Sequence, residues 1–485
     1  MLPPPIPGRQ HPKKSCSDSS RDSSTQTEQL HVQAATMKPQ RTSTTHTFRQ
    51  KVESANSNAI CTTTSHKVGR RTLRQIVHPE SSDGDGSGSA VHKAYIIPIF
   101  QRRYCWKTQQ WDTLWHDMTR RQSIRHSLGR LTCTNVRTEE ERSIIIDGQQ
   151  RFTTVTLILA AIRDKFVELA SRSDVSSRKT EVSVRLIHKM IFSDTRAMED
   201  WVADSQKNFI VAEGTALEFC RLIPTYCDRA AYLAAILPPS APQVQSFLAE
   251  TYKPRWHRPL LAKQYFARKI RSTMLSGSTS QAHPIYMLHK LLGLLLDGID
   301  ILYFPIDIDR GFEDGTEDTQ VIYERLAIRD ATWCKPRRDT EYQSMSAVDM
   351  IRNLLLGSFR TTKEKTSFYE TLWLPLERLF QTSGLEKGGD DANHEEEGLK
   401  AVIRAFFQHE STFGMLPPPN PASATETKVI GGRIYQDFEA WMTRDYECWG
   451  ASFPECSSSP VASLAEAHAM DVGGRLLEFA KCRRR

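Results

Sequence analysis

The chain has 485 residues, of which 39% are hydrophobic and 25% charged, and its formal net charge is +7. This length allows two or three domains, and the composition excludes a fibrous or wholly disordered protein. The mild positive charge is compatible with nucleic acid or a nucleotide as a partner, but it identifies neither.

The ten cysteines are scattered, and no two have the spacing of a zinc knuckle or of a disulfide framework. We therefore expect neither a structural zinc nor a secreted protein, and predict reduced thiols inside a cell, in the cytoplasm or the nucleus. The longest apolar stretch, residues 285–306, contains four polar or charged residues, so we expect no membrane partner. The Ser/Thr-rich first 75 residues leave an organelle transit peptide open.

Residues 1–90 are predicted to be a disordered tail. They are rich in Ser, Thr, Gln and Pro and close with SSDGDGSGSA, a composition that buries too little apolar surface to offset the entropy of ordering. The alternative is a regulatory or targeting tail, in which VGRRTLR (residues 68–74) is a weak basic patch.

A small α/β unit is predicted over residues 91–170. IIPIF (residues 96–100) contains a proline and fits an edge strand or an extended entry segment. Residues 127–136 and 143–146 are predicted as strands on either side of a charged turn. A short helix after Thr108 places four apolar residues on one face: Trp111, Leu114, Trp115 and Met118.

The segment IIIDGQQRFTT (residues 144–154) joins a predicted strand to a long helix. The strand ends in a polar cluster of five residues, which is followed by Thr153 and Thr154; the five are Asp147, Gly148, Gln149, Gln150 and Arg151. We expect Asp147 as the helix N-cap and Gly148 in the sharp turn. Such a turn presents amide hydrogens and a partial positive charge to one point, as phosphate-binding sites do. The alternative is a capped helix with a polar first turn and no ligand.

The helix after this turn is predicted to be mostly buried. Its apolar residues recur at spacings of three and four: Phe152, Val155, Leu159, Ile162, Phe166 and Leu169. Arg151 opposes the preference of a first helical turn for acids, which indicates an anion nearby.

Residues 171–450 are predicted to be mainly helical. Helical spacing appears in five segments: 217–237, 260–274, 285–296, 320–328 and 345–359. A strand is expected at residues 302–308. Ser346 is the expected N-cap of the last helix, with Asp349 three residues later. Residues 390–397 and 417–432 are predicted loops, and residues 451–485 a C-terminal tail.

Several collinear blocks resemble a known family, the N-terminal domain of GmrSD-type restriction endonucleases, which is ParB/sulfiredoxin-like and carries a DGQQR motif. The blocks are IPIFQRRYCW, QQWDTLWHDM, HSLGRL, IIIDGQQRFTTVTLIL and later helical segments, and together they span residues 94–446. The resemblance implies a helix-rich mixed α/β fold, with a ParB/sulfiredoxin-like unit followed by a mainly helical region.

The resemblance also implies nucleotide binding and nucleoside triphosphate hydrolysis in defence against foreign DNA. Asp147, Gln149, Gln150 and Arg151 are then the candidate catalytic residues. The candidate nucleotide-binding residues are Gln101, Arg102, Gly148, Thr153 and Thr154. The implied ligand is a nucleoside triphosphate, with Mg²⁺ as the candidate cofactor.

Individual roles follow from side-chain chemistry. Arg151 and Arg102 are planar forks suited to phosphate oxygens. Gln149 or Gln150 is suited to orienting an attacking water. Asp147 is suited to Mg²⁺ or a water, and Thr153 to capping a phosphate.

Two departures from the family pattern affect these expectations. Family members often continue into an HNH nuclease domain, whereas His468 here has no HNH-like context, and His257 and His409 match no nuclease motif. We therefore expect a separate nuclease subunit as a partner. In addition, Ala327 and Asp330 stand where the family usually has Asn and Gly, and an insert, CKPRRDTEYQ, follows.

Three functions remain open at this point. The first is a regulatory or DNA-sensing NTPase module, the second a nucleotide- or DNA-binding module without hydrolysis, and the third a nuclease. A DNA-binding face would draw on scattered basic residues, which helical proteins also display for solubility: Arg120, Arg121, Arg125, Arg130, Arg255, Arg258, Arg268, Lys269 and Arg271. Binding of that kind would weaken steeply with salt.

Overall fold

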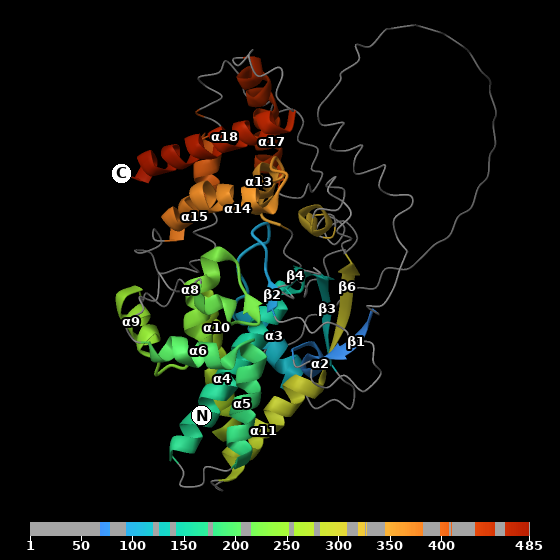
Figure 1. Cartoon of the computed structure of the whole chain (residues 1–485), viewed down its shortest axis with the longest axis vertical. Helices are drawn as coiled ribbons and strands as arrows, with labels where there is room; N and C mark the ends of the chain where they lie inside the picture. The colour runs from blue at the N-terminus through green and yellow to red at the C-terminus, as the bar shows by residue number, and fades with distance from the viewer. Residues whose placement is uncertain are drawn as a thin grey trace, which may run out of the picture. The chain divides into compact units, whose positions relative to one another are not determined.

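The structure is a computed structural model of the whole chain (Figure 1). It describes residues 68–77, 94–119, 126–135, 142–172, 178–204, 215–251, 257–275, 282–307, 319–324, 326, 345–381, 398–406, 409, 432–451 and 461–484. Within these ranges the protein is helix-rich with one small mixed sheet, as predicted from the sequence.

The sheet has six strands in the order β1-β6-β3-β4-β2-β5. They are β1 (Gly69–Thr72), β2 (Ala94–Ile96), β3 (His126–Asn135), β4 (Arg142–Asp147), β5 (Leu222–Ile223) and β6 (Ile299–Asp307). β6 runs parallel to β3, and β2 runs parallel to both of its neighbours; the other pairs are antiparallel. The strands predicted at residues 127–136, 143–146 and 302–308 are confirmed as β3, β4 and β6, with ends that differ by one to three residues.

The sheet extends beyond the predicted unit of residues 91–170. β1, β5 and β6 come from outside that unit, because strand pairing joins segments far apart in the chain. Of the two alternatives predicted for residues 96–100, an edge strand or an extended entry segment, the edge strand is wrong. β2 ends at Ile96 and lies between β4 and β5, and Pro98 follows the strand, where its missing N–H removes no ladder bond.

Part of the predicted N-terminal tail is ordered. β1 pairs with β6, and α2 (Leu73–Val77) buries its apolar side chains in the core. Two of the three arginines in the VGRRTLR patch have partners in the fold. The Arg71 guanidinium lies 4.4 Å from the Tyr303 ring centre, and Arg74 pairs with Asp297 at 2.7 Å. Tertiary partners therefore stabilise a segment whose composition alone predicts disorder.

One hydrophobic core lies between the sheet and the helices around α4. The helices are α3 (Thr108–Thr119), α4 (Gln149–Arg172), α5 (Arg178–Ile191), α6 (Thr195–Ala203), α8 (Arg229–Ile236), α9 (Pro242–Thr251), α10 (Arg258–Leu275) and α11 (Ala282–Asp297). α4 is almost entirely enclosed, since Leu157, Ile158 and Ile162 have no exposed surface. Burying each such side chain contributes roughly 1.5–3 kcal/mol, so α4 is a rigid base for the turn that precedes it.

The single helix predicted over residues 217–237 is wrong. The chain there forms a helical turn at 215–218, β5, a 3₁₀ helix, η2 (Tyr226–Asp228), and α8. The helical spacing is correct only for α8. Ile223 pairs with Ile96 of β2, so this part is a strand, and Pro224 disfavours a helix that runs through this position.

A second hydrophobic core belongs to the C-terminal helices. These are α13 (Ala347–Leu356), α14 (Thr362–Phe368), the π-helix η4 (Tyr369–Trp373), α15 (Leu374–Gln381), α17 (Gly432–Ala451) and α18 (Val461–Arg484). Ser346 is the N-cap of α13, as predicted: its Oγ accepts a hydrogen bond from the amide of Asp349 at 3.1 Å.

The C-terminal tail predicted at residues 451–485 contains α18. Val472 and Leu476 of this helix are fully buried, and His468 bonds to Asp445 at 3.0 Å, so α18 packs in the second core. Several predicted features lie outside the described residues. They are the loop at 390–397, the loop at 417–432 apart from Gly432, which begins α17, the residues Ala327 and Asp330, and the insert at 334–343. No described helix combines the length and the apolar character needed to cross a membrane.

Candidate functional site

The DGQQR motif forms a tight strand-to-helix turn. β4 ends at Asp147, α4 begins at Gln149, and Gly148 between them has a φ of +98°. The carbonyl of Gly148 accepts the first helical bond, from the Phe152 amide at 3.0 Å, so Gly148 and not Asp147 occupies the N-cap position. A Cβ atom at residue 148 would lie 2.9 Å from the carbonyl oxygen of Arg130, so the turn requires glycine.

Asp147 is aimed by an irregularity in β4. Thr132 of β3 pairs with Asp147, whereas the next residue, Cys133, pairs with Ile145, so β4 carries one extra residue at this point. Bulges of this kind bend a strand and redirect a side chain. The carboxylate of Asp147 lies 3.1 Å from Nε of Arg130 and 3.5 Å from Nη2 of Arg151, and each contact uses a different oxygen.

Arg151 is held against the backbone of β3. Its Nη1 donates to the carbonyl of Leu128 at 3.0 Å. Gly129 has a φ of +92°, and a Cβ atom there would lie 2.0 Å from Nη1 of Arg151. The glycine in HSLGRL therefore makes the space for the guanidinium, which is positioned before any ligand arrives.

The two glutamines of the motif have different environments. Gln150 is bonded at both ends of its amide: Oε1 accepts from the Cys105 amide at 2.8 Å, and Nε2 donates to the Arg103 carbonyl at 2.9 Å. Gln149 is 7% exposed, and its Oε1 is buried without a hydrogen-bond partner among the described residues. Gln150 thus holds the segment around Tyr104, while the Gln149 amide oxygen is available.

Gln101 lies at the same end of β4. Its Nε2 donates to the carbonyls of Ile145, at 2.5 Å, and Ile146, at 3.0 Å. Because carbonyls only accept, the amide nitrogen and not the oxygen of Gln101 faces β4. Its Oε1 is buried and, like that of Gln149, has no hydrogen-bond partner within the described ranges. A buried polar atom without a hydrogen-bond partner costs about 1–3 kcal/mol, so both amide oxygens are candidates to accept a hydrogen bond from a ligand.

The two threonines of the motif face the protein interior. Thr154 bonds to the Gln150 carbonyl and to the Tyr104 hydroxyl, both at 2.7 Å, and Tyr104 also accepts from Trp111 Nε1 at 2.8 Å. Thr153 is 2% exposed. The structure therefore places both hydroxyls beneath the turn rather than at its surface, and it adds Tyr104, which the sequence analysis missed.

Arg102 lies on another side of the same segment. Burial raises the pKa of the Cys105 thiol, and the positive charge of Arg102 opposes that shift. Burial likewise raises the pKa of Tyr323 to about 12 against the same opposing charge. The structure thus places the Arg102 charge near Cys105 and Tyr323, while Gln101 beside it faces β4.

The segment 100–105 also contacts the C-terminal helices through a buried arginine. Arg352 of α13 is 2% exposed, and its Nη2 donates to the Phe100 carbonyl at 2.9 Å. Its Nη1 lies 3.0 Å from Asp349 and 3.7 Å from Glu377. Two carboxylates and a backbone carbonyl therefore satisfy one buried guanidinium.

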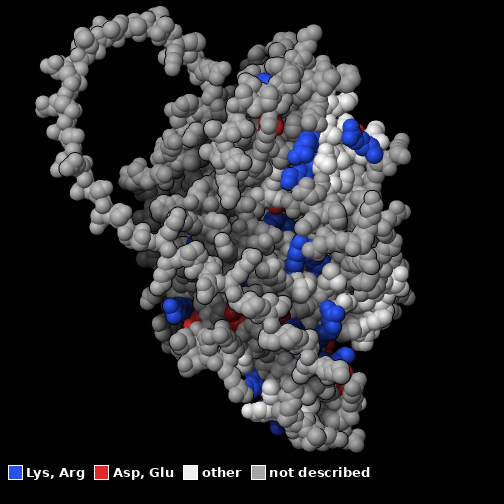
Figure 2. Space-filling model, turned by 180° about the vertical axis from the view of Figure 1, so that it is seen from behind, with Lys and Arg blue, Asp and Glu red and all other residues white. Residues whose placement is uncertain are grey.

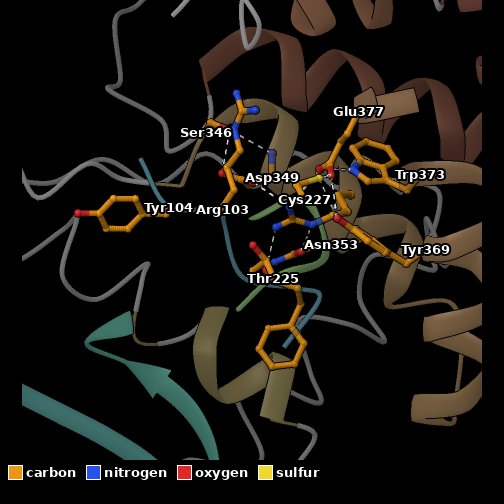
Figure 3. Close-up of polar contacts among 12 residues, drawn as sticks. Arg103, Tyr104, Thr225, Cys227, Ser346, Asp349, Asn353, Tyr369, Trp373 and Glu377 are labelled. Atoms are coloured by element: carbon orange, nitrogen blue, oxygen red, sulfur yellow. Dashed lines mark hydrogen bonds and ion pairs between the residues drawn. The ribbon is translucent and has the colours of Figure 1, made fainter. Parts of the chain in front are cut away.

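Glu377 is the second centre of this network (Figure 3). Its carboxylate accepts from the Tyr369 hydroxyl at 2.7 Å, the Trp373 indole at 2.9 Å and the Cys227 thiol at 2.6 Å. Tyr369 and Trp373 are the ends of η4, and the wider turn of a π-helix brings both side chains onto one carboxylate.

Asp228 links this region back to Tyr104. Its Oδ2 accepts from the Tyr104 amide at 2.5 Å and from the Thr225 hydroxyl at 2.9 Å. Burial raises the pKa of Asp228 to about 6, although the Tyr104 amide and the Arg103 charge act in the opposite direction. The DGQQR turn therefore connects through one short segment to a network of buried ionisable groups.

The residues at the turn do not fit direct coordination of Mg²⁺ by Asp147. Both oxygens of its carboxylate face guanidinium groups, and the described part of the chain holds no cluster of three His, Cys, Asp or Glu side chains suited to a metal.

Several of the basic residues considered for DNA binding have intramolecular partners. Arg130 pairs with Asp147, Lys269 pairs with Asp112 at 2.7 Å, and Arg258 donates to the carbonyls of Cys105 and Trp106. On the face seen in Figure 2, the described Lys and Arg side chains form separate groups, some of them beside acidic residues. Arg120, Arg121, Arg125 and Arg255 lie outside the described residues.

The sequence model of the family described as GmrSD restriction endonuclease, N-terminal domain, matches residues 85–230. Residues 85–230 are similar to this family. The matched GmrSD-type domain includes β2, β3, β4 and the whole of α4, and with them Gln101 and the DGQQR turn. The sequence resemblance extended to residue 446, and the part beyond residue 230 stays a prediction. No curated protein matches the chain at a significant level.

Proposed function

We propose that the GmrSD-type domain binds a nucleoside triphosphate at the DGQQR turn and hydrolyses it. The observation that carries the proposal is the arrangement at the start of α4. There Arg151 is prepositioned in the same turn as Gln149, and Gln101 bonds to the end of β4 that precedes this turn. The amide oxygens of both glutamines are buried without a partner among the described residues. The family assignment supports the same site.

The phosphates are proposed to lie against the first turn of α4. Amide groups that the helix does not use point toward its N-terminus, and the helix dipole favours negative charge there. Arg151 and Arg130 supply two guanidinium groups that share Asp147. A phosphate oxygen can replace part of the Asp147 contact, so the carboxylate holds both arginines in place until the ligand binds.

Gln149 is the proposed residue for orienting the attacking water. Its amide oxygen is free to accept from a water, whereas Gln150 is held by the backbone of residues 103 and 105. Gln150 is accordingly a positioning residue. Mg²⁺ is proposed to enter with the phosphates, which commonly supply most of its protein-site ligands.

A role in defence against foreign DNA, in partnership with a separate nuclease subunit, is the proposed cellular context. It rests on the family name and on the sequence resemblance, and DNA enters the proposal as an effector of turnover. An exposed face with separate basic groups is compatible with weak electrostatic contact to DNA, which salt would reduce.

The test is phosphate release by the full chain with ATP, GTP and CTP in the presence of Mg²⁺, with and without DNA. We expect turnover that falls by at least about a hundredfold in Arg151→Ala, since loss of one prepositioned charged donor costs that much in other enzymes. Arg196→Ala, which removes an exposed arginine of α6, is the matched control.

The second candidate is a module that binds the nucleotide without hydrolysing it. It is favoured because both ends of the Gln150 amide are bonded to the backbone, so Gln150 has no free group to orient a water. It predicts thermal stabilisation by nucleotide without phosphate release; a ligand at a hundred times its Kd adds about 2.7 kcal/mol. Stabilisation and turnover both absent from a folded protein would reject both candidates. A nuclease ranks third, because the described residues contain no metal-binding cluster.

A further inference from the structure

Two apolar side chains of β6 are exposed beside the DGQQR turn. Leu302 and Phe304 are each 39% exposed, whereas Ile301 and Tyr303, which alternate with them, are buried in the first core. Because side chains alternate along a strand, Leu302 and Phe304 lie on the face of the sheet that points away from that core.

Phe304 is in line with the DGQQR turn. It pairs with Thr132 of β3, and Thr132 pairs in turn with Asp147 of β4. The three residues therefore form a row across three neighbouring strands, and the Cα atoms of Phe304 and Asp147 are about 10 Å apart at the usual strand spacing. Asp147 lies on the same face as Phe304, since it binds Arg130, the direct neighbour of Leu302.

The surroundings of this apolar pair are polar and positively charged. Leu302 pairs with Arg130 on one side and with Arg70 on the other. Thr132, in the middle of the row, has a buried Oγ1 without a hydrogen-bond partner among the described residues. Two exposed apolar side chains bordered by guanidinium groups suit a planar aromatic ligand that carries negative charge.

We propose that the nucleobase of the triphosphate stacks on Phe304, with Leu302 extending the platform. This inference rests on the proposed function, because the phosphates at the turn are what direct the base along the row. The span of about two strand spacings separates the base from the phosphates. Stacking uses the π-face that every base has, so ATP, GTP and CTP all fit, and the larger purine rings bind more tightly.

The test measures binding by the full chain of two probes, the β,γ-imido analogue of ATP and inorganic tripolyphosphate, each with Mg²⁺. Phe304→Ala is expected to weaken binding of the ATP analogue about tenfold and to leave tripolyphosphate binding unchanged. Phe304→Trp is expected to restore the affinity for the analogue. Tyr286→Ala, which removes a 63% exposed aromatic side chain of α11, is the matched control and should change neither affinity.

The outcomes separate this inference from the proposed function. If Arg151→Ala weakens both probes while Phe304→Ala weakens neither, the phosphate site stands and the stacking proposal is overturned. The stacking proposal is also overturned if Phe304→Ala weakens the binding of both probes equally. It is overturned as well if Phe304→Ala lowers folding stability without any change in affinity, because Phe304 then packs against the chain itself. A wild-type protein that binds neither probe rejects the proposed function.

Discussion

The guanidinium of Arg151 occupies the space that a side chain at Gly129 would fill. A Cβ atom at residue 129 would lie 2.0 Å from Nη1, so the guanidinium can take this position only because residue 129 is glycine. The same contact lets Nη1 reach the Leu128 carbonyl. A glycine in one element therefore sets the position of the main basic side chain in the other.

Gly129→Ala is expected to reduce nucleotide binding as much as Arg151→Ala does. The positive φ adds about 1–2 kcal/mol of backbone strain, and the methyl group displaces the arginine. Calorimetric titration with the imido analogue of ATP measures the effect. Gly293→Ala in α11 is the control, because a Cβ there meets open space; it should leave binding intact and stabilise the helix by up to about 1 kcal/mol. Wild-type affinity in Gly129→Ala would contradict the proposed role of Arg151.

Gln150→Leu and Gln149→Leu should separate folding from function. The first leaves the Cys105 amide and the Arg103 carbonyl without their partner, which costs about 2 kcal/mol or more in the free energy of unfolding. The second removes a buried amide oxygen that has no partner among the described residues, so it should retain stability and lose turnover. Urea unfolding and phosphate release together give the comparison, and equal stability of the two variants would show that the Gln150 bonds contribute little.

Arg352→Met should be strongly destabilising. The change leaves the carboxylates of Asp349 and Glu377 in a buried region without their shared cation, at a cost of about 3–5 kcal/mol. The double variant Arg352→Met, Glu377→Gln removes one of those charges and should recover part of the loss. Urea unfolding at pH 7 measures both free energies, and a single-variant loss below about 1 kcal/mol would contradict the view that the network stabilises the fold.

Asp228 should make a stability contribution that falls as the pH rises. Its pKa is raised to about 6 by burial, so the folded protein holds the proton more tightly than the unfolded chain does. The contribution is full below about pH 4 and is lost as the pH rises through about 6, with a total of about 3 kcal/mol.

The measurement compares Asp228→Asn with the wild-type protein by urea unfolding from pH 4 to pH 7. The difference between the two free energies should change by a large part of that amount across this range. A comparison of variants is needed because burial lowers the pKa of His188 to about 4, and this group titrates in the same range with the opposite effect. A pH-independent difference would show that Asp228 has an ordinary pKa.

Local patterns in the sequence determined the elements around the DGQQR turn. The apolar spacing of Trp111 to Met118 and of Phe152 to Phe166 predicted α3 and α4, and Gly148 predicted the turn, because periodicity and backbone freedom act within a few residues. The helical reading of residues 217–237 was wrong because β5 gains a strand partner more than a hundred residues earlier in the chain, a gain that spacing along the chain does not report.

The sequence alone determined the composition of the candidate site, namely Asp147, Gln149, Gln150 and Arg151 at a strand-to-helix turn. Only the tertiary structure decided their roles. It directed the amide of Gln150 into the backbone of residues 103–105, left the Gln149 amide oxygen without a partner among the described residues, and gave Arg151 a space made by Gly129. It also put Phe304 in line with Asp147. The physical reason is that hydrogen-bond partners and burial arise between segments that are distant in the chain, whereas sequence spacing reports only neighbours along it.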